Sequence, residues 1–118
     1  MQLIYLGQPL VYLEDQEEIE NAADLLVLLD EIAGYKPVFS SHPAVGRLNG
    51  KHLRDLYKVK FKPPGEDVRV YLFADKGLLV VVHLIRSKRR TKLTKGQIKS
   101  LKEAIKAAKR EVNARATC

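Results

Sequence analysis

Three strand-like segments in a row constrain the fold of this chain more than any other feature. They are "LYKVKFK" (residues 56–62), "VRVYLFA" (68–74) and "LLVVVHLI" (78–85), all rich in β-branched or aromatic residues. The connecting residues "PPGED" and "DKG" are short and have the composition of turns. Parallel neighbours would need a crossover of a dozen residues or more, so these segments are expected to pair as antiparallel hairpins.

One helix-like segment precedes these strands in the sequence and another follows them. In residues 14–33 apolar positions recur at steps of three and four, acidic residues fill the first turns, and Gly34 is the expected end. A second helix is expected after Thr94, which forms a candidate capping box with Gln97. Its apolar stripe consists of Ile98, Leu101, Ala104, Ile105, Ala108 and Val112. A short strand, "LIYLG" (3–7), precedes the first helix, and residues 36–52 have a loop-like composition.

These elements predict an α+β fold with a small antiparallel sheet of about four strands. The N-terminal helix would cover one face of the sheet, and a C-terminal helix would follow the last strand. The 118 residues are expected to form a single domain, residues 1–118. No apolar run approaches the roughly 18 residues of a membrane helix, and the start lacks the pattern of a secretory signal. The only cysteine is Cys118, so no intrachain disulfide can form. We therefore expect a cytoplasmic protein with no membrane partner.

Charge is divided unevenly along the chain. Residues 1–35 contain eight acidic residues and no Lys or Arg, whereas the remainder contains all 21 Lys and Arg residues and six acids. Residues 1–35 therefore carry a formal charge of −8 and the remainder +15, which together give the net charge of +7. A positive field of this kind attracts polyanions, above all nucleic acid.

The alternation within the strands predicts which side chains share a face. Lys58 and Lys60 fall on one face of their strand, and Arg69 falls on the same face of the next. The apolar residues of the opposite face would pack against the acidic first helix. The third strand ends in a cluster of cations that is expected at the rim of the same basic face: Arg86, Lys88, Arg89, Arg90 and Lys92.

Residues 46–104, "GRLNGKHLRDLYKVKFKPPGEDVRVYLFADKGLLVVVHLIRSKRRTKLTKGQIKSLKEA", resemble the core of the RelE/HigB toxins of bacterial toxin–antitoxin pairs. The resemblance rests on the "LYKVKFK" and "VRVYLF" strands, the apolar strand ending in "SKRR" and the helix after it. The segment "VVVHLIRSK" is most similar to the phage-derived HigB-like branch. The resemblance implies a RelE-like fold and a ribosome-dependent, metal-independent endoribonuclease without cofactors. This enzyme cleaves translated mRNA, inhibits translation and is held inactive by an antitoxin protein.

The reaction that the resemblance implies is attack of a ribose 2′-hydroxyl on the adjacent phosphate. It requires cations that stabilise the growing negative charge, together with a base and an acid. Residues that match catalytic positions of the family are Lys58, Lys60, Arg69 and Arg89. Some family members carry a tyrosine soon after this arginine, but "TKLTKG" has none, and His83 is then the candidate on the sheet. Candidate RNA-binding residues are Arg86, Lys88, Arg90, Lys92, Lys99, Lys102 and Lys106.

Other interpretations of the same residues remain open. A ParE-like toxin of the same fold would poison DNA gyrase by binding alone, and a non-catalytic domain would bind RNA without cleaving it. The strand lysines could belong to an ordinary hydrated face, and His83 could be structural. Tyr71 and Phe73 either stack on a base or pack beneath the last helix. His42 and His52 lack metal-ligand spacing, so no metal site is expected and both are taken as solvated or positional.

Overall fold

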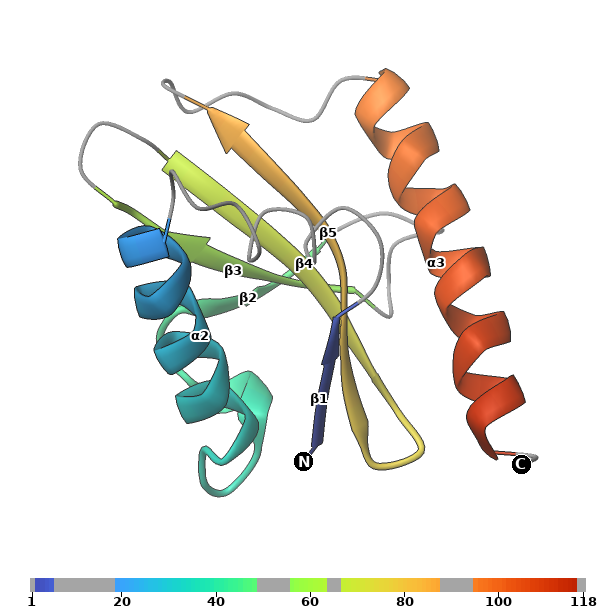
Figure 1. Cartoon of the computed structure of the whole chain (residues 1–118), viewed down its shortest axis with the longest axis horizontal. Coiled ribbons are helices and arrows are strands. Elements are labelled where there is room, and N and C mark those ends of the chain that lie inside the picture. The colour runs from blue at the N-terminus through green and yellow to red at the C-terminus, as the bar shows by residue number, and fades with distance from the viewer. Residues whose placement is uncertain (1, 6–18, 49–55, 64–66, 88–94, 117–118) are drawn as a thin grey trace.

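The computed structural model describes residues 2–5, 19–48, 56–63, 67–87 and 95–116 (Figure 1). Its elements follow in the order β1 (Gln2–Tyr5), α2 (Ile19–Ala33), the 3₁₀ turn η2 (Phe39–Ser41), β2 (Val45–Arg47), β3 (Tyr57–Phe61), β4 (Asp67–Asp75), β5 (Leu78–Ser87) and α3 (Lys95–Ala116). The strands form one sheet in the order β1-β5-β4-β3-β2. Helices α2 and α3 lie on opposite sides of this sheet (Figure 1). The predicted α+β class is confirmed.

The sheet differs from the expectation in strand number and direction. Among the described residues it has five strands instead of about four, because Val45–Arg47, within the expected loop, pairs antiparallel with β3. Three residues are too few to display an alternating pattern, so this strand has no signal in the sequence. Strand β1 runs parallel to β5, with Leu3 opposite Leu79, so the sheet is mixed. Because α2 and three strands separate β1 from β5, no hairpin dictates an antiparallel pairing.

One half of the core lies between α2 and the sheet. Leu25, Leu29 and Ile32 recur at helical spacing and are at most 1% exposed. They pack with alternate residues of the strands, among them Val59 and Val70. Burying each such side chain contributes about 1.5–3 kcal/mol. This arrangement confirms that the apolar set of β3 and β4 faces the first helix, which ends at Ala33 just before Gly34, as predicted.

The other half of the core lies between α3 and the opposite face of the sheet. Leu101, Ala108 and Val112 of α3 pack in one cluster with Tyr71 and Phe73 of β4 and with residues of β1 and β5. The face expected to be open and basic is therefore partly covered. Of the two interpretations of Tyr71 and Phe73, the structure supports packing beneath the last helix, because they are 0% and 2% exposed.

An irregularity in the β4–β5 pairing sets the position of His83. Tyr71 lies opposite His83, whereas Leu72 lies opposite Val81, so Val82 is an extra residue in β5. A β-bulge of this kind interrupts the alternation of side chains between the two faces. Val82 packs in the cluster under α3. Beyond the bulge, His83 returns to a position directly across from Tyr71.

The β4–β5 hairpin closes through a two-residue turn with positive φ at Lys76 (52°) and Gly77 (78°). Two consecutive positive φ values are the property of a type I′ turn, whose twist matches that of paired strands. The Lys76 ammonium also donates a 2.7 Å hydrogen bond to the Asn113 side-chain oxygen. This contact ties the turn to the last helical turns of α3.

Candidate functional site

The structure brings four of the predicted site residues together on the α3 side of the sheet. They occupy two neighbouring rows across the strands. In one row Lys60 lies opposite Arg69, which lies opposite Ile85; in the other, Lys58 lies opposite Tyr71, which lies opposite His83. Residues directly opposite each other on antiparallel strands have Cβ atoms about 5 Å apart. The predicted common face of Lys58, Lys60 and Arg69, called the basic patch below, is confirmed.

The basic patch combines exposed and half-buried cations. Lys60 is exposed, whereas Lys58 and Arg69 are half-buried. Lys60 and Arg69 are like charges in directly opposite positions, an arrangement that costs stability in a sheet. An anion bound over this pair would relieve the repulsion. The side chain of Lys58 extends over Gly46 of β2, because a Cβ built on Gly46 would meet Lys58 Cε at 3.8 Å.

Tyr71 lies beneath the patch with its hydroxyl group buried. This hydroxyl has no hydrogen-bond partner among the described residues. Burial raises the pKa of Tyr71 above its ordinary value of 10.0, because the phenolate would lose its hydration. The Arg69 guanidinium opposes this rise in pKa through its charge and through the hydrogen bond that it would donate to the phenolate form. At neutral pH Tyr71 is therefore a neutral phenol next to a cation.

His83 supplies the imidazole of the site, on the strand next to that of Arg69 and Tyr71. It is half-buried, and burial lowers its pKa below the ordinary value of 6.5 because the imidazolium form is poorly hydrated. Its ring centroid lies 6.3 Å from that of Tyr71, with the two planes tilted by 41°. The imidazole is therefore neutral at pH 7 and able to accept a proton at the β5 edge of the basic patch, across Tyr71 from Lys58.

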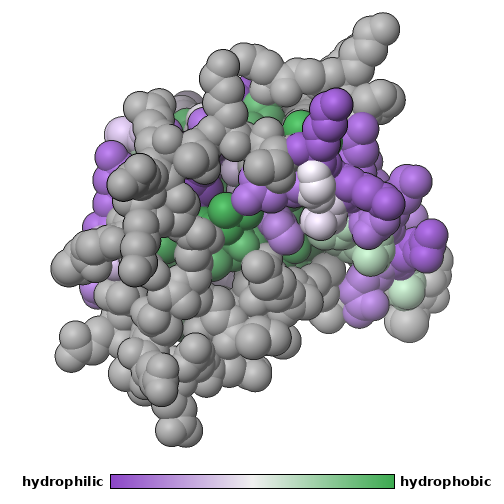
Figure 2. Space-filling model, turned by 90° about the horizontal axis from the view of Figure 1, so that it is seen from above, coloured by the Kyte–Doolittle hydropathy of each residue, from purple (hydrophilic) through white to green (hydrophobic). Residues whose placement is uncertain are grey.

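The predicted RNA-binding lysines of α3 lie along one side of that helix. Lys99 and Lys106 are exposed, and Lys102 is half-buried. Their spacing of three and four residues puts them on a common helical face. Seen from above, hydrophilic residues gather on the side of the molecule where α3 lies (Figure 2). This face is suited to contacts with a phosphate backbone.

Five predicted residues cannot be assessed in the same way. Lys88, Arg89, Arg90 and Lys92 lie outside the described residues. For Arg86 the backbone is described and pairs with Val68, whereas its side chain is not. The predicted catalytic role of Arg89 and the predicted cationic rim therefore stay predictions.

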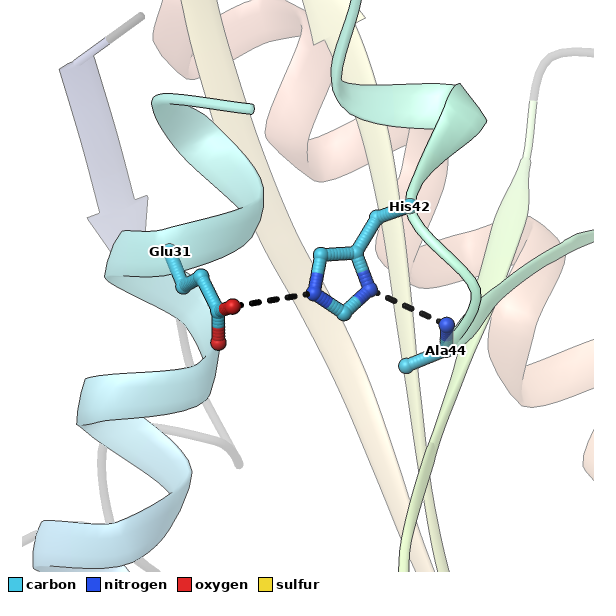
Figure 3. A network of polar contacts seen from close by, with 3 residues as sticks. All are labelled: Glu31, His42 and Ala44. Atoms are coloured by element: carbon cyan, nitrogen blue, oxygen red, sulfur yellow. Dashed lines mark hydrogen bonds and ion pairs between the residues drawn. The ribbon is translucent and has the colours of Figure 1, made fainter. Parts of the chain in front are cut away.

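His42 has a structural environment that the sequence did not reveal. Its Nδ1 accepts a 3.0 Å hydrogen bond from the backbone N–H of Ala44, and its Nε2 lies 3.7 Å from Glu31 Oε1 (Figure 3). The Tyr35 ring packs edge-on against the imidazole, with centroids 4.8 Å apart. His42 is 9% exposed, so it is positional and not solvated. It links the chain before β2 to the end of α2.

A pocket of about 370 Å³ lies at the start of β3, next to the last residues of β4. Phe39 and Tyr57 meet edge-to-face at 4.9 Å, and the Arg47 guanidinium lies 5.8 Å from the centre of the Tyr57 ring. Phe73, Ala74 and Asp75 of β4 and Lys109 of α3 complete the lining. Sequence reasoning missed this pocket, because Arg47 lay in an expected loop and the other residues come from four separate elements.

Comparison with models of protein families, with curated proteins and with solved structures finds no match to this chain. Within the described ranges, no helix is long and apolar enough to cross a membrane. The same residues contain no group of three or more His, Cys, Asp or Glu side chains arranged to hold a metal ion.

Proposed function

We propose that this protein is a toxin of the RelE/HigB type, a ribosome-dependent and metal-independent endoribonuclease that cleaves translated mRNA in the cytoplasm. The observation that carries the proposal is the pair of cross-strand rows that joins Lys58, Lys60, Arg69 and His83. Together these residues supply the cations and the neutral base that cleavage by a ribose 2′-hydroxyl requires. The resemblance of residues 46–104 to this toxin family supports the same conclusion.

In this proposal each residue of the site has a defined task. His83, neutral at pH 7, accepts the proton of the attacking 2′-hydroxyl, while Lys60 and Arg69 stabilise the charge that builds on the phosphate oxygens. The bond between phosphorus and the 5′-oxygen breaks and the departing oxygen takes a proton from solvent water, leaving a 2′,3′-cyclic phosphate and a 5′-hydroxyl end; the His83 imidazolium then returns its proton to solvent. Lys58, beside the phosphate, positions the strand. The α3 lysines Lys99, Lys102 and Lys106 hold the RNA backbone away from the reacting bond.

A second candidate function is binding of RNA without cleavage. The observation that favours it is the partial cover of the site by α3, which leaves Tyr71 fully buried and His83 half-buried. A general base must come within hydrogen-bond reach of the proton it takes, and only the exposed part of the half-buried His83 ring can reach the 2′-hydroxyl of an RNA. In this alternative the basic patch serves only as an electrostatic surface.

The partner implied by the proposal is an acidic antitoxin segment that neutralises the cations when the toxin is inactive. Opposite charge would speed the encounter, so the association rate should fall as salt is raised. Charge reversal at Arg89 and Arg90 should weaken both antitoxin binding and toxicity. Unchanged antitoxin affinity with the same salt dependence would assign the contact to another surface, for example the acidic helix α2.

Induced expression in bacteria tests the proposal against the gyrase alternative. The proposed function predicts growth arrest with new 5′ ends inside coding regions, mapped by primer extension, while chromosomal DNA stays intact. Arrest with intact messages and broken DNA would overturn it in favour of a ParE-like activity. The variant Lys60→Ala is the cleavage-impaired control. It should fold normally, because an exposed lysine can be replaced without disturbing the core, and it should produce fewer new 5′ ends.

A further inference from the structure

The outward side of α2 combines an exposed apolar side chain with carboxylates. Of the large apolar side chains described, Val27 is the most exposed, at 69%. Asp24, Asp30 and Glu31 are also exposed and lie three or four positions from Val27, so they surround it on the helix surface. These four residues are called the acidic face below. An apolar centre with a charged rim is the usual composition of a protein–protein contact.

Charges at the ends of the two helices oppose the helix macrodipoles. Asp30 and Glu31 lie near the C-terminal end of α2, whose last turn contains no basic residue. Lys95 begins α3, whose first turn contains no acidic residue. Carboxylates are stabilising at the N-terminal end of a helix and cations at its C-terminal end, so both placements cost stability in a single molecule. Each helix end would be stabilised by the charges that the other carries.

The two helices cannot neutralise each other within one molecule, because they lie on opposite sides of the sheet (Figure 1). Among the described side chains, none forms an ion pair with Asp24 or Asp30. Five lysines at steps of four and three residues form a continuous row along α3, called the lysine stripe below: Lys95, Lys99, Lys102, Lys106 and Lys109. The acidic face and the lysine stripe can therefore meet only between two molecules.

Like charges exclude the symmetric ways of pairing two copies. A two-fold axis at α2 would bring two acidic faces together, and a two-fold axis at α3 would bring two lysine stripes together. The arrangement that joins opposite charges is heterologous, with the acidic face of one copy on the lysine stripe of the next. Lysine side chains also offer apolar methylene stems to a side chain such as Val27.

We propose that this chain associates head to tail, with the acidic face of one copy docked on the lysine stripe of a second copy. Because the two surfaces lie on opposite sides of the molecule, each added copy leaves one surface open at either end, and the assembly can grow. A contact between two single helices is small, so the association is weak and reversible. It needs neither RNA nor the ribosome, so its failure and the failure of the proposed function are distinguishable.

Sedimentation equilibrium on the full chain, freed of nucleic acid by purification at high salt, tests the inference. At about 50 mM salt the average mass should rise with protein concentration beyond that of two chains, and at about 500 mM salt it should return to that of one chain. A mass that reaches a plateau at two chains, or that does not depend on salt, would overturn the inference. A single chain at both salt concentrations would also overturn it, and would leave the acidic face to a basic partner protein.

Two variants separate the two surfaces. Val27→Lys and Lys106→Glu should each weaken the association at least about tenfold, because each brings like charges together in the contact. Both residues are exposed, so both variants should fold, which circular dichroism checks. The lysine stripe is intact in the first variant and the acidic face in the second. An equimolar mixture should therefore form complexes of two chains and no larger ones, whereas a mixture that stays monomeric would contradict head-to-tail docking.

Lys36→Glu is the matched control for Lys106→Glu. Lys36 is an exposed lysine outside α3, and its reversal changes the net charge by the same amount. Lys36→Glu should therefore change the association constant less than about threefold. If it weakens the association as much as Lys106→Glu does, net charge and not the lysine stripe controls the association, and the inference is wrong.

Discussion

Replacing Tyr71 by Phe is expected to stabilise the protein. The Tyr71 side chain is 0% exposed, and its hydroxyl has no partner among the described residues. A buried hydroxyl without a hydrogen bond costs about 1–3 kcal/mol, and phenylalanine fills nearly the same volume without that cost. Because the nearby Arg69 recovers part of the loss, we expect a gain of about 1 kcal/mol in the free energy of unfolding.

The corresponding change in melting temperature follows from the size of the chain. Unfolding entropy near 60 °C is about 2.1 cal/mol/K per residue, or about 250 cal/mol/K for 118 residues. A gain of about 1 kcal/mol therefore raises Tm by about 4 °C. Urea unfolding and calorimetry measure the two quantities independently. Tyr35→Phe, at a half-exposed tyrosine, is the matched control and should change the free energy by less than about 0.5 kcal/mol.

The pH dependence gives a second measurement of the same group. The native pKa of Tyr71 is raised above 10.0, so above about pH 10 the unfolded chain releases this proton while the native state retains it. Stability should therefore fall as pH rises above about 10, and the Phe variant should lose this contribution. The account of an unpartnered hydroxyl would be refuted by a Tyr71→Phe protein that is less stable than the wild type and whose stability falls above pH 10 as steeply as that of the wild type.

Three further changes test other parts of the structure. The native pKa of His83 lies below 6.5, so the stability that the neutral imidazole contributes is present above pH 6.5 and is lost as the pH falls below it. In His83→Gln the free energy of unfolding, measured with urea between about pH 7 and 4, should therefore fall less steeply with decreasing pH. Gly77→Ala should cost about 1 kcal/mol in urea unfolding because of the positive φ of 78°, whereas Gly34→Ala, with its nearest contact at 3.8 Å, should cost less; equal costs would contradict the turn geometry. Lys102→Ala combined with Lys106→Ala should weaken RNA binding and lower its salt slope by about 2, and an unchanged slope in filter binding would remove α3 from the interface.

Much of the sheet was predictable because its side chains alternate. The residues of β3 and β4 that face α2 were assigned correctly from period two, and so was the common face of Lys58, Lys60 and Arg69. The bulge at Val82 was not predictable, since a bulge has no sequence signature within an apolar run. Strand β2 was missed because a three-residue strand shows no period. The segment of β1 was expected as a strand, but its parallel pairing with β5 was missed because a distant pairing leaves no local signal.

The extent to which α3 covers the sheet could also not be predicted from the sequence. An apolar stripe indicates that a helix packs on something, but not where along the sheet it comes to rest. Tyr71 and Phe73 therefore stayed ambiguous between stacking on a base and packing in the core. The pocket depends on Arg47, Tyr57, Asp75 and Lys109 meeting in space, which no local pattern encodes.

The most direct test of the central claim is single-turnover cleavage of a message on purified ribosomes. The account predicts that the wild-type protein cuts the message during translation and leaves free RNA largely intact. Lys60→Ala should slow cleavage by about 10²-fold while its affinity for the ribosome changes less than about threefold, because Lys60 acts on the developing phosphate charge. Equal losses of affinity and rate, or an unchanged cleavage rate in the variant, would contradict the claim that the basic patch is a catalytic site.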